Sequence, residues 1–343
     1  MLAEIKMSKQ GPFCFLVALL LLAGGCATVS PQAGAKLADA GVETASTTKN
    51  TIKDTRLGLE TYIQGLYLQA ALRGTAPPDT PTQAGTSTLD QVEKIKKMLA
   101  ARESVLTDLV NTYSSFGALA KSNFAQDLPK EMEKLGSAIN GYAQAVGAEP
   151  VIPAEAQNLA SRVTGILAQF FLSQKLKQCS VVIKEQLIRF NNLFLREKQD
   201  ILDLRRDMAK ESSRIMEELW KRGLGQPHPI LRPFLEDSGL DYDEPRVNLW
   251  LEGKAPPELK MSPDDVRKVK DAILNVVKRR SKLKHELQDQ IIGRTESSLK
   301  ELIKAHDNFE KGQPLGLDQL TQHLNELREI LDLIKQLRGG AKS

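Results

Sequence analysis

Apolar residues recur in steps of three and four along most of this chain, and that spacing is typical of amphipathic α-helices. The pattern covers residues 36–73, about 90–122 and 128–146. A further stripe near the C-terminus comprises Leu317, Leu320, Leu324, Leu327, Leu331 and Ile334. No alternation of apolar and polar residues is long enough to predict a sheet. The pattern therefore predicts an all-α fold.

The longest helical pattern covers residues 154–222, which contain no proline and a single glycine, Gly165. A continuous helix of this length would extend for about 100 Å. From Leu176 onward, steps of four and three residues alternate regularly, as in a coiled coil. The positions on this stripe are Leu176, Ser180, Ile183, Leu187, Phe190, Phe194, Glu197, Ile201, Leu204, Met208, Glu211 and Ile215.

A second long helix is predicted from Ser262 to Phe309. Its first residues, Ser-Pro-Asp-Asp at 262–265, are typical of a helix start. Serine is a good N-cap, proline fits the first turn, and the two carboxylates favour the positive end of the helix dipole. A turn at 312–316, which contains two glycines and a proline, then precedes the last helix.

Residues 223–261, which separate the two long helices, are the region without a helical pattern. Its prolines forbid a continuous helix; they are Pro227, Pro229, Pro233, Pro245, Pro256 and Pro257. The candidate partner-contact residues are Phe234, Tyr242 and Trp250 within this insertion and Trp220 just before it. Aromatic side chains bury a large area at low entropic cost. We predict that the insertion is either a partner-contact site or a cap over the end of the two long helices.

The first 26 residues differ in composition from the rest of the chain. Lys6 and Lys9 precede an apolar run from Phe13 to Ala23. This run is too short to span a bilayer, which requires about 20 apolar residues. It has the length of the hydrophobic region of a secretory signal peptide. Two glycines and then Cys26 follow it directly.

This arrangement resembles the lipobox signal of bacterial lipoproteins. Ala23 stands where that family most often has leucine, and Gly24 and Gly25 lead directly to Cys26. The resemblance implies cleavage before Cys26, a diacylglyceryl group on its thiol and often a further acyl chain such as palmitate on its amine. Two or more chains make a stable membrane anchor. Ala27 occupies the place where an aspartate would resemble an inner-membrane retention signal, so an outer-membrane location, on the periplasmic or surface face, is expected in a Gram-negative source.

These observations predict a signal peptide over 1–25 and a tether over 26–34. N-terminal helices follow over 35–147. A long helical hairpin then occupies 154–338, with the insertion 223–261 and the C-terminal helix. The predicted fold is an elongated antiparallel helical bundle or coiled coil with one Pro-rich, non-helical insertion.

Charge adds one candidate surface. The net charge of +4 is too small to indicate a polyanionic partner, and no nucleic acid is expected. The basic cluster comprises Lys278, Arg279, Arg280, Lys282 and Lys284. Because a helix turns about 100° per residue, these cations would spread around more than half of its circumference. They are expected either to bind phosphate groups, such as those of anionic lipids, or to pair with Glu211, Glu217 and Glu218 of a facing helix.

Cysteine and histidine provide little catalytic chemistry. Cys14 would leave with the signal peptide, so Cys179 is the remaining thiol once Cys26 is lipidated. It is expected to be a buried side chain or to form an intermolecular disulfide. The four histidines lack the Glu-x-x-His spacing of di-iron bundles. His285 and His306 would lie about 30 Å apart on one helix, so they cannot share a metal.

Other motifs of metal and enzyme sites are also missing. The acidic residues between 236 and 244 do not follow the order of an EF-hand calcium loop. The chain contains no H-E-x-x-H, G-x-S-x-G, G-x-G-x-x-G or phosphate-binding G-x-x-x-x-G-K-[ST] motif. We therefore expect no metal, and no cofactor other than the covalent lipid on Cys26.

Three classes of function are compatible with this sequence. The favoured one is a membrane-anchored cell-envelope lipoprotein with a scaffolding or binding role and a protein partner in the envelope. The second is a helical, membrane-active protein that resembles pore formers; its most apolar candidate, Val163 to Ile183, carries Lys175 and Lys177. The third, an enzyme that uses carboxylates or Cys179, has no positive support.

Overall fold

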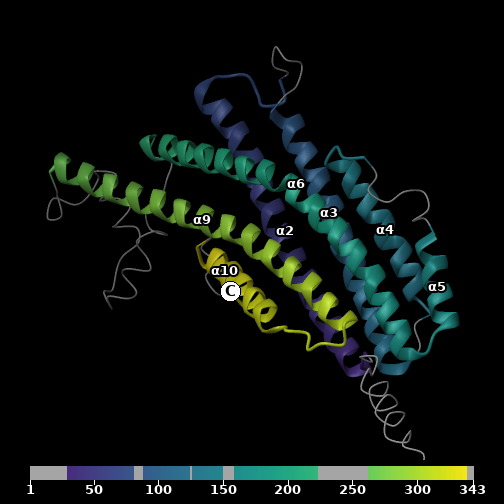
Figure 1. Ribbon diagram of the computed structural model, residues 1–343. Coiled ribbons are helices and arrows are strands. Elements are labelled where there is room, and N and C mark those ends of the chain that lie inside the picture. Colours follow the sequence, from purple (N-terminus) through teal and green to yellow (C-terminus); the bar gives the residue numbers. More distant parts are fainter. Residues whose placement is uncertain (1–28, 81–87, 124–125, 150–157, 223–261, 338–343) are drawn as a thin grey trace, which may run out of the picture.

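The computed structural model describes residues 29–80, 88–123, 126–149, 158–222 and 262–337, and Figure 1 shows how their helices are arranged. These helices are α2 (Pro31–Arg73), α3 (Thr88–Ser122), α4 (Leu128–Ala145), α5 (Leu159–Gln169), α6 (Leu172–Lys221), α9 (Pro263–Glu310) and α10 (Asp318–Leu337). The described ranges contain no strand. The predicted all-α fold is therefore confirmed, while coiled-coil geometry stays a prediction.

Two helices make contacts throughout the molecule. α6 contacts α2, α3, α4, α5 and α9, and α2 contacts α3, α6, α9 and α10. In Figure 1, α2, α3, α4 and α5 form one side of the molecule, whereas parts of α6 and α9 continue beyond them. One cluster of buried apolar side chains includes residues from all seven described helices.

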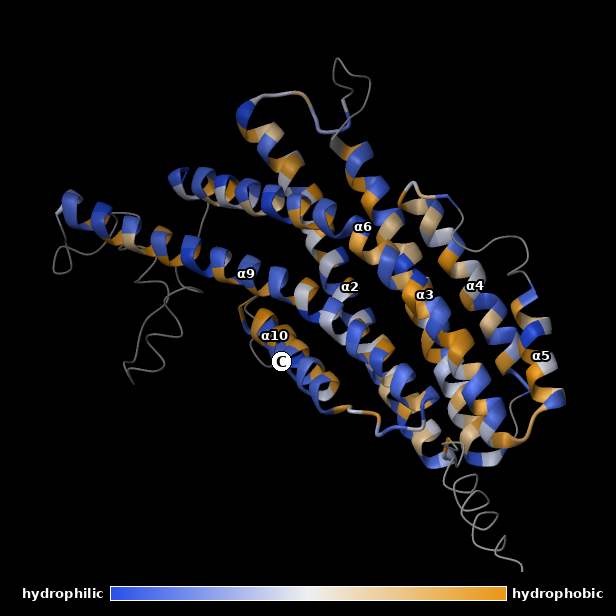
Figure 2. Cartoon of the chain, in the orientation of Figure 1, coloured by the Kyte–Doolittle hydropathy of each residue, from blue (hydrophilic) through white to orange (hydrophobic). Residues whose placement is uncertain are grey.

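Each described helix carries both kinds of surface. Hydrophobic and hydrophilic residues are interspersed along every one of them in Figure 2. This is the pattern of helices that bury one face against neighbours and expose another to water. Among the described helices, none has the length and apolarity that a membrane span requires.

The prediction of a continuous helix over 154–222 is wrong, because the chain is extended at Phe170 and Phe171 between α5 and α6. The break allows the short α5 to pack against both α4 and α6. The residues that α5 buries are Leu159, Val163 and Ile166. α6 therefore has 50 residues and a length of about 75 Å instead of the expected 100 Å.

The stripe of four- and three-residue steps on α6 faces the core, as predicted. All of its positions except Leu204 and Glu211 are buried. The two other polar members, Ser180 and Glu197, are also buried, so each requires a hydrogen-bonding partner inside the protein.

The start of α2 corrects the predicted tether. The helix begins at Pro31, so residues 31–34 are helical. The Ser30 side chain accepts a hydrogen bond of 3.1 Å from the backbone N–H of Ala33, a cap worth about 1 kcal/mol. Ser262 caps α9 in the same way, as predicted, and accepts from the backbone N–H of Asp265 at 3.2 Å.

Glu197 of α6 forms a buried ion pair with Arg102 of α3. The Arg102 guanidinium also lies 5.2 Å from the centre of the Phe194 ring. The net stabilisation from such a pair is small, but removing one partner leaves an uncompensated buried charge, at a cost of about 3–5 kcal/mol. The pair therefore favours one register of α3 against α6.

A second buried polar group connects α3, α6 and α9. Tyr113 Oη lies 2.7 Å from His306 Nε2, and Ser180 Oγ lies 2.8 Å from His306 Nδ1. A neutral imidazole has one N–H donor and one acceptor nitrogen, so both hydroxyl groups can be satisfied. Complete burial, together with nearby Lys184, lowers the pKa of His306 to about 3.

Gly41 of α2 has no side chain, and the Tyr113 ring occupies the space that a β-carbon would need. Alanine at Gly41 and alanine at Gly58 should therefore change the stability of the fold in opposite directions. A β-carbon on Gly41 would lie 2.3 Å from Tyr113 Cδ1, whereas one on Gly58 would lie 3.5 Å from Met208 Cε. Gly41→Ala should lower the free energy of unfolding by about 1–3 kcal/mol through overpacking. Gly58→Ala should raise it by about 0.5–1 kcal/mol, because alanine is the better helix former. Urea unfolding followed by circular dichroism measures both; an unchanged Gly41→Ala variant would contradict this packing.

His306 should make stability depend on pH. In the unfolded chain its pKa is near 6.5, so as the pH falls the unfolded state binds the proton first. The fold should thereby lose about 2 kcal/mol between about pH 7.5 and pH 5. In His306→Gln this contribution disappears, and the loss of stability over the same range should be smaller by that amount. Denaturant unfolding of both proteins at the two pH values tests this, and identical pH profiles would exclude a neutral buried His306.

Candidate functional site

A cleft of about 560 Å³ lies between the C-terminal half of α2, the C-terminal half of α6 and the middle of α9. Leu337, the last residue of α10, also lines it. Its size falls within the range of small-ligand pockets, about 300–1,000 Å³. We call it the α2–α6–α9 cleft. Its apolar lining includes Tyr62, Leu68, Met208, Ile215, Met216 and Val277.

Two glycines of α2 lie opposite apolar residues of α6 in this cleft. Gly58 and Gly65 are seven residues apart, as are Met208 and Ile215 on α6. A β-carbon on Gly65 would lie 2.7 Å from Ile215 Cδ1, which is closer than van der Waals contact allows. The absence of a side chain at Gly65 therefore lets α2 approach Ile215, whereas a β-carbon on Gly58 would be accommodated, at 3.5 Å from Met208 Cε.

The α9 wall of the cleft is positively charged. Arg280 and Lys284 lie one helical turn apart and both line the cleft, and none of the lining residues is acidic. His285 lines it too, but partial burial, aided by Lys284 and Arg205, lowers the pKa of His285 to about 4. At neutral pH the charges on this wall are therefore those of Arg280 and Lys284.

A buried arginine lies behind the same wall. Arg205 of α6 is 5% exposed, and its guanidinium donates to Thr55 Oγ1 at 2.6 Å and to the backbone carbonyl of Gln288. Gln288 lines the cleft. Burial is the main cause that lowers the pKa of Arg205, to about 10, and it outweighs the attraction of more distant carboxylates. Arg205 forms no ion pair with any described residue, so its charge is held by neutral acceptors.

The residues of the predicted basic cluster have different surroundings in the structure. Lys278 forms the expected interhelical ion pair with Glu217 at 3.3 Å, whereas Lys282 lies 3.8 Å from Glu286 of its own helix. Arg279 is exposed. Only Arg280 and Lys284 line the cleft. The cluster is therefore not one continuous surface, in agreement with the predicted spread around the helix.

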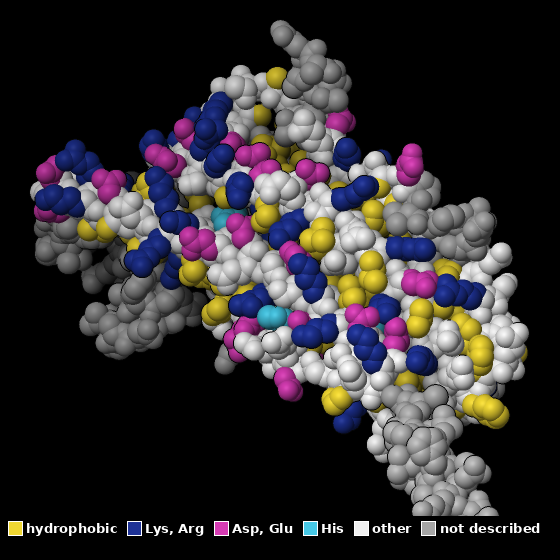
Figure 3. Space-filling view, in the orientation of Figure 1, with side chains coloured by type: hydrophobic (Ala, Val, Ile, Leu, Met, Phe, Trp, Pro, Cys, Tyr) yellow, Lys and Arg dark blue, Asp and Glu magenta, His cyan; other side chains and the backbone are white. Residues whose placement is uncertain are grey.

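The other two glutamates expected to face this cluster pair instead with arginines three or four residues further along the chain. Glu211 lies 3.4 Å from Arg214, and Glu218 lies 3.9 Å from Arg222. In Figure 3, basic and acidic side chains alternate over the surface of α6 and α9, with apolar side chains between them.

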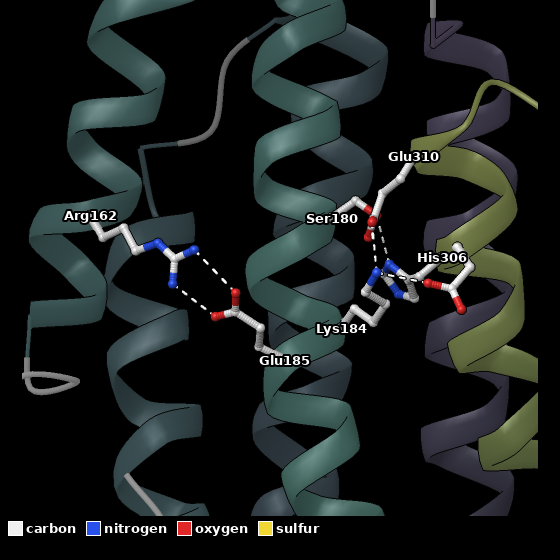
Figure 4. Close-up of polar contacts among 7 residues, drawn as sticks. Arg162, Ser180, Lys184, Glu185, His306 and Glu310 are labelled. Carbon is white, nitrogen blue, oxygen red and sulfur yellow. Dashed lines mark hydrogen bonds and ion pairs between the residues drawn. The ribbon is translucent and has the colours of Figure 1, made fainter. Parts of the chain in front are cut away.

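The Ser180–His306–Tyr113 chain has the contacts of a nucleophile beside a base. However, each of the three side chains is 0% exposed, so a substrate cannot reach Ser180 Oγ while these helices are packed. Figure 4 shows Ser180 and His306 next to Lys184, which donates to Glu310 at 2.6 Å and to Asp307 at 2.8 Å. These contacts hold α6 against α9, and we assign the chain a structural role.

A similar polar contact joins α5 to α6. Arg162 donates to both carboxylate oxygens of Glu185, at 2.8 and 3.3 Å (Figure 4). The polar side chains in this view therefore connect helices.

Several predicted site residues lie outside the described residues. They are Cys26, Phe234, Tyr242 and Trp250, together with the acidic residues of 236–244 and His228. Trp220 is described, and it is half-buried in the last turn of α6. No group of three or more His, Cys, Asp or Glu side chains in the described ranges could hold a metal ion.

The cations of the cleft were predicted from the sequence, but its apolar walls were not. The available signal was the seven-residue spacing of Gly58 and Gly65, which matches that of Met208 and Ile215. It could not be used without knowing that α2 packs against this part of α6.

Comparisons with protein-family models, with curated proteins and with solved structures find no match to this chain. Its function must therefore be inferred from the residues and their geometry.

Cys179 should be unreactive in the folded protein. Its side chain is 1% exposed, and burial raises the pKa of its thiol to about 12. At about pH 8 we expect iodoacetamide to label it at least about 100-fold more slowly than in urea, because the thiolate is the reactive form. Mass spectrometry of the peptide that carries Cys179 measures both rates. Equal rates, or a Cys179-linked dimer on a non-reducing gel, would instead support the intermolecular disulfide.

Proposed function

We propose that this chain is a lipid-anchored cell-envelope protein with a binding role. In this proposal Cys26 carries the lipid, and the α2–α6–α9 cleft binds a ligand at a distance from the membrane. The proposal is supported chiefly by the position of the cleft along α2, the helix that follows the proposed anchor Cys26 in the sequence. Gly58, the first cleft residue on α2, lies about 40 Å from Pro31 at about 1.5 Å per residue.

The length of the tether supports the same arrangement. Four residues, 27–30, separate Cys26 from α2, and they span at most about 14 Å. Lipid on Cys26 would therefore be held near the start of α2, far from the cleft. A binding site within a limited distance of its anchor suits a protein that presents or receives a ligand next to a membrane.

The end of α6 is part of the proposed contact site for a protein partner. Trp220 lies one turn beyond Met216, a residue of the cleft, and the two share a face of the helix. The insertion 223–261 follows directly, with Phe234, Tyr242 and Trp250 as its candidate contacts. We propose that a partner in the envelope docks on this part of the chain.

The anchor predicts a specific labelling pattern. Cells grown with an alkyne analogue of palmitate should label the wild-type chain and the Cys179→Ser control, but not Cys26→Ser. The labelled proteins should sediment with membranes and be released by detergent, since two or more acyl chains make a stable anchor. Labelling of Cys26→Ser, or an unlabelled wild-type chain, would refute the lipoprotein assignment.

A second experiment addresses the partner. Crosslinking in intact envelopes should capture the same protein with the wild-type chain and the Cys179→Ser control. It should capture less when residues 226–258 are replaced by a short Gly-Ser turn. Unchanged capture would remove the insertion from the proposed contact surface.

A further inference from the structure

We propose that the α2–α6–α9 cleft binds a single-chain amphiphile with an anionic head group. The apolar chain lies between α2 and α6, and the head group lies against Arg280 and Lys284 of α9. This inference rests on the part of the proposed function that makes the cleft a binding site, and not on the lipid anchor.

The walls of the cleft suit an apolar chain. Tyr62, Leu68 and Ile215 provide apolar surface from α2 and α6, and Val277 provides it from α9. Met208 and Met216 add flexible, polarisable side chains that adapt to the shape of a bound chain. The volume of about 560 Å³ is that of a pocket for one small ligand.

The charges around the cleft favour an anion at one end. Arg280 and Lys284 lie one turn apart on α9, and no acidic residue lines the cleft. Arg205 adds a buried positive charge behind Gln288, which is partly offset by Asp54, whose carboxylate accepts from Gln288 Nε2 at 3.4 Å. Two cations that converge on one carboxylate or phosphate form charge-assisted hydrogen bonds, which are stronger than neutral ones.

The α2 wall of the cleft is less favourable for an anion than the α9 wall. Burial and the carboxylates of Glu211 and Asp207 raise the pKa of Tyr62 on α2. Asp207 and Glu211 directly precede the lining residues Met208 and Ser212 on α6, so carboxylates lie beside this part of the cleft. An anionic head group is therefore favoured next to the two cations of α9 over the α2 wall.

Two other occupants fit the cleft less well. The acyl chains expected on Cys26 would attach about 40 Å away along α2. A second copy of this chain, docked about a twofold axis through the cleft, would bring the cations of the two α9 helices together. A free anionic amphiphile has neither problem.

The test uses the full-length Cys26→Ser chain, which lacks the lipid attachment site, and the fluorescent fatty acid cis-parinaric acid as the probe. Palmitate and lysophosphatidate should both displace the probe, and the tighter of the two identifies the preferred head group. Hexadecanol should displace it about tenfold more weakly, a difference of 1.4 kcal/mol. Inorganic phosphate should not displace it. The proposal would be overturned if hexadecanol displaced the probe as well as palmitate does, or if inorganic phosphate displaced it.

Charge variants with matched controls locate the head group. The double variant Arg280→Gln, Lys284→Gln should weaken binding of the anionic amphiphiles about tenfold and leave hexadecanol unchanged. The control Arg279→Gln, Lys282→Gln removes the same charge from α9 outside the cleft lining and should have no effect. Equal effects of the two double variants would mean that net charge, and not the cleft, governs binding.

A variant that fills the cleft tests where the apolar chain of the amphiphile lies. Ser212 of α6 lines the cleft and Ser213 does not, so Ser212→Trp should abolish binding while Ser213→Trp preserves it. Circular dichroism checks the fold, and Ser281→Trp on α9 replaces Ser212→Trp if that variant unfolds. Retained binding in a folded cleft-filling variant would refute the site.

The two proposals can fail separately. If no amphiphile binds while wild-type Cys26 is acylated and the envelope partner is captured, the ligand class is wrong and the proposed anchor and partner stand. If the amphiphile binds as predicted but Cys26 is not acylated, only the anchor is wrong.

Discussion

The burial of one face of α6 is the constraint on which the rest of the structure depends. This helix contacts α2, α3, α4, α5 and α9, and its stripe of apolar residues extends from Leu176 to Ile215. A stripe of that length cannot be covered by a single neighbour, because the other described helices cross it over only part of its length (Figure 1). Different helices therefore cover successive parts of one face, and one core cluster includes residues from all seven described helices.

The polar residues on that face determine how the neighbours align. Glu197 pairs with Arg102 of α3, and Ser180 meets His306 of α9. Each contact is buried, so a shift of one helix along another would leave a charge or a polar atom without a partner. The apolar surface supplies most of the stabilising free energy, while these contacts favour one register. The same burial makes the Ser180–His306–Tyr113 chain inaccessible to a substrate.

The cleft lies on the same helix, farther toward its C-terminal end. There α2 presents Gly58 and Gly65 to Met208 and Ile215, and α9 contributes Arg280 and Lys284. The cations of the basic cluster differ in role because they point in different directions around α9. Lys278 meets Glu217, whereas Arg280 and Lys284 line the α2–α6–α9 cleft. An apolar volume with a positive edge is the chemical basis of the proposed ligand class.

The sequence by itself determined the helices, because their period, caps and breakers act within a few residues of one another. The Ser262 cap and the inward stripe of α6 were predicted in this way. The break at Phe170 and Phe171 was not, since no glycine or proline marks it and the packing of α5 against α4 and α6 accompanies it. The site depended still more on tertiary structure. Arg280 on α9 could be singled out as a cation, but Gly65 comes from α2, and Ile215 and Arg205 come from α6. Only the packing of these helices brings them together, and short-range patterns carry no information about such contacts.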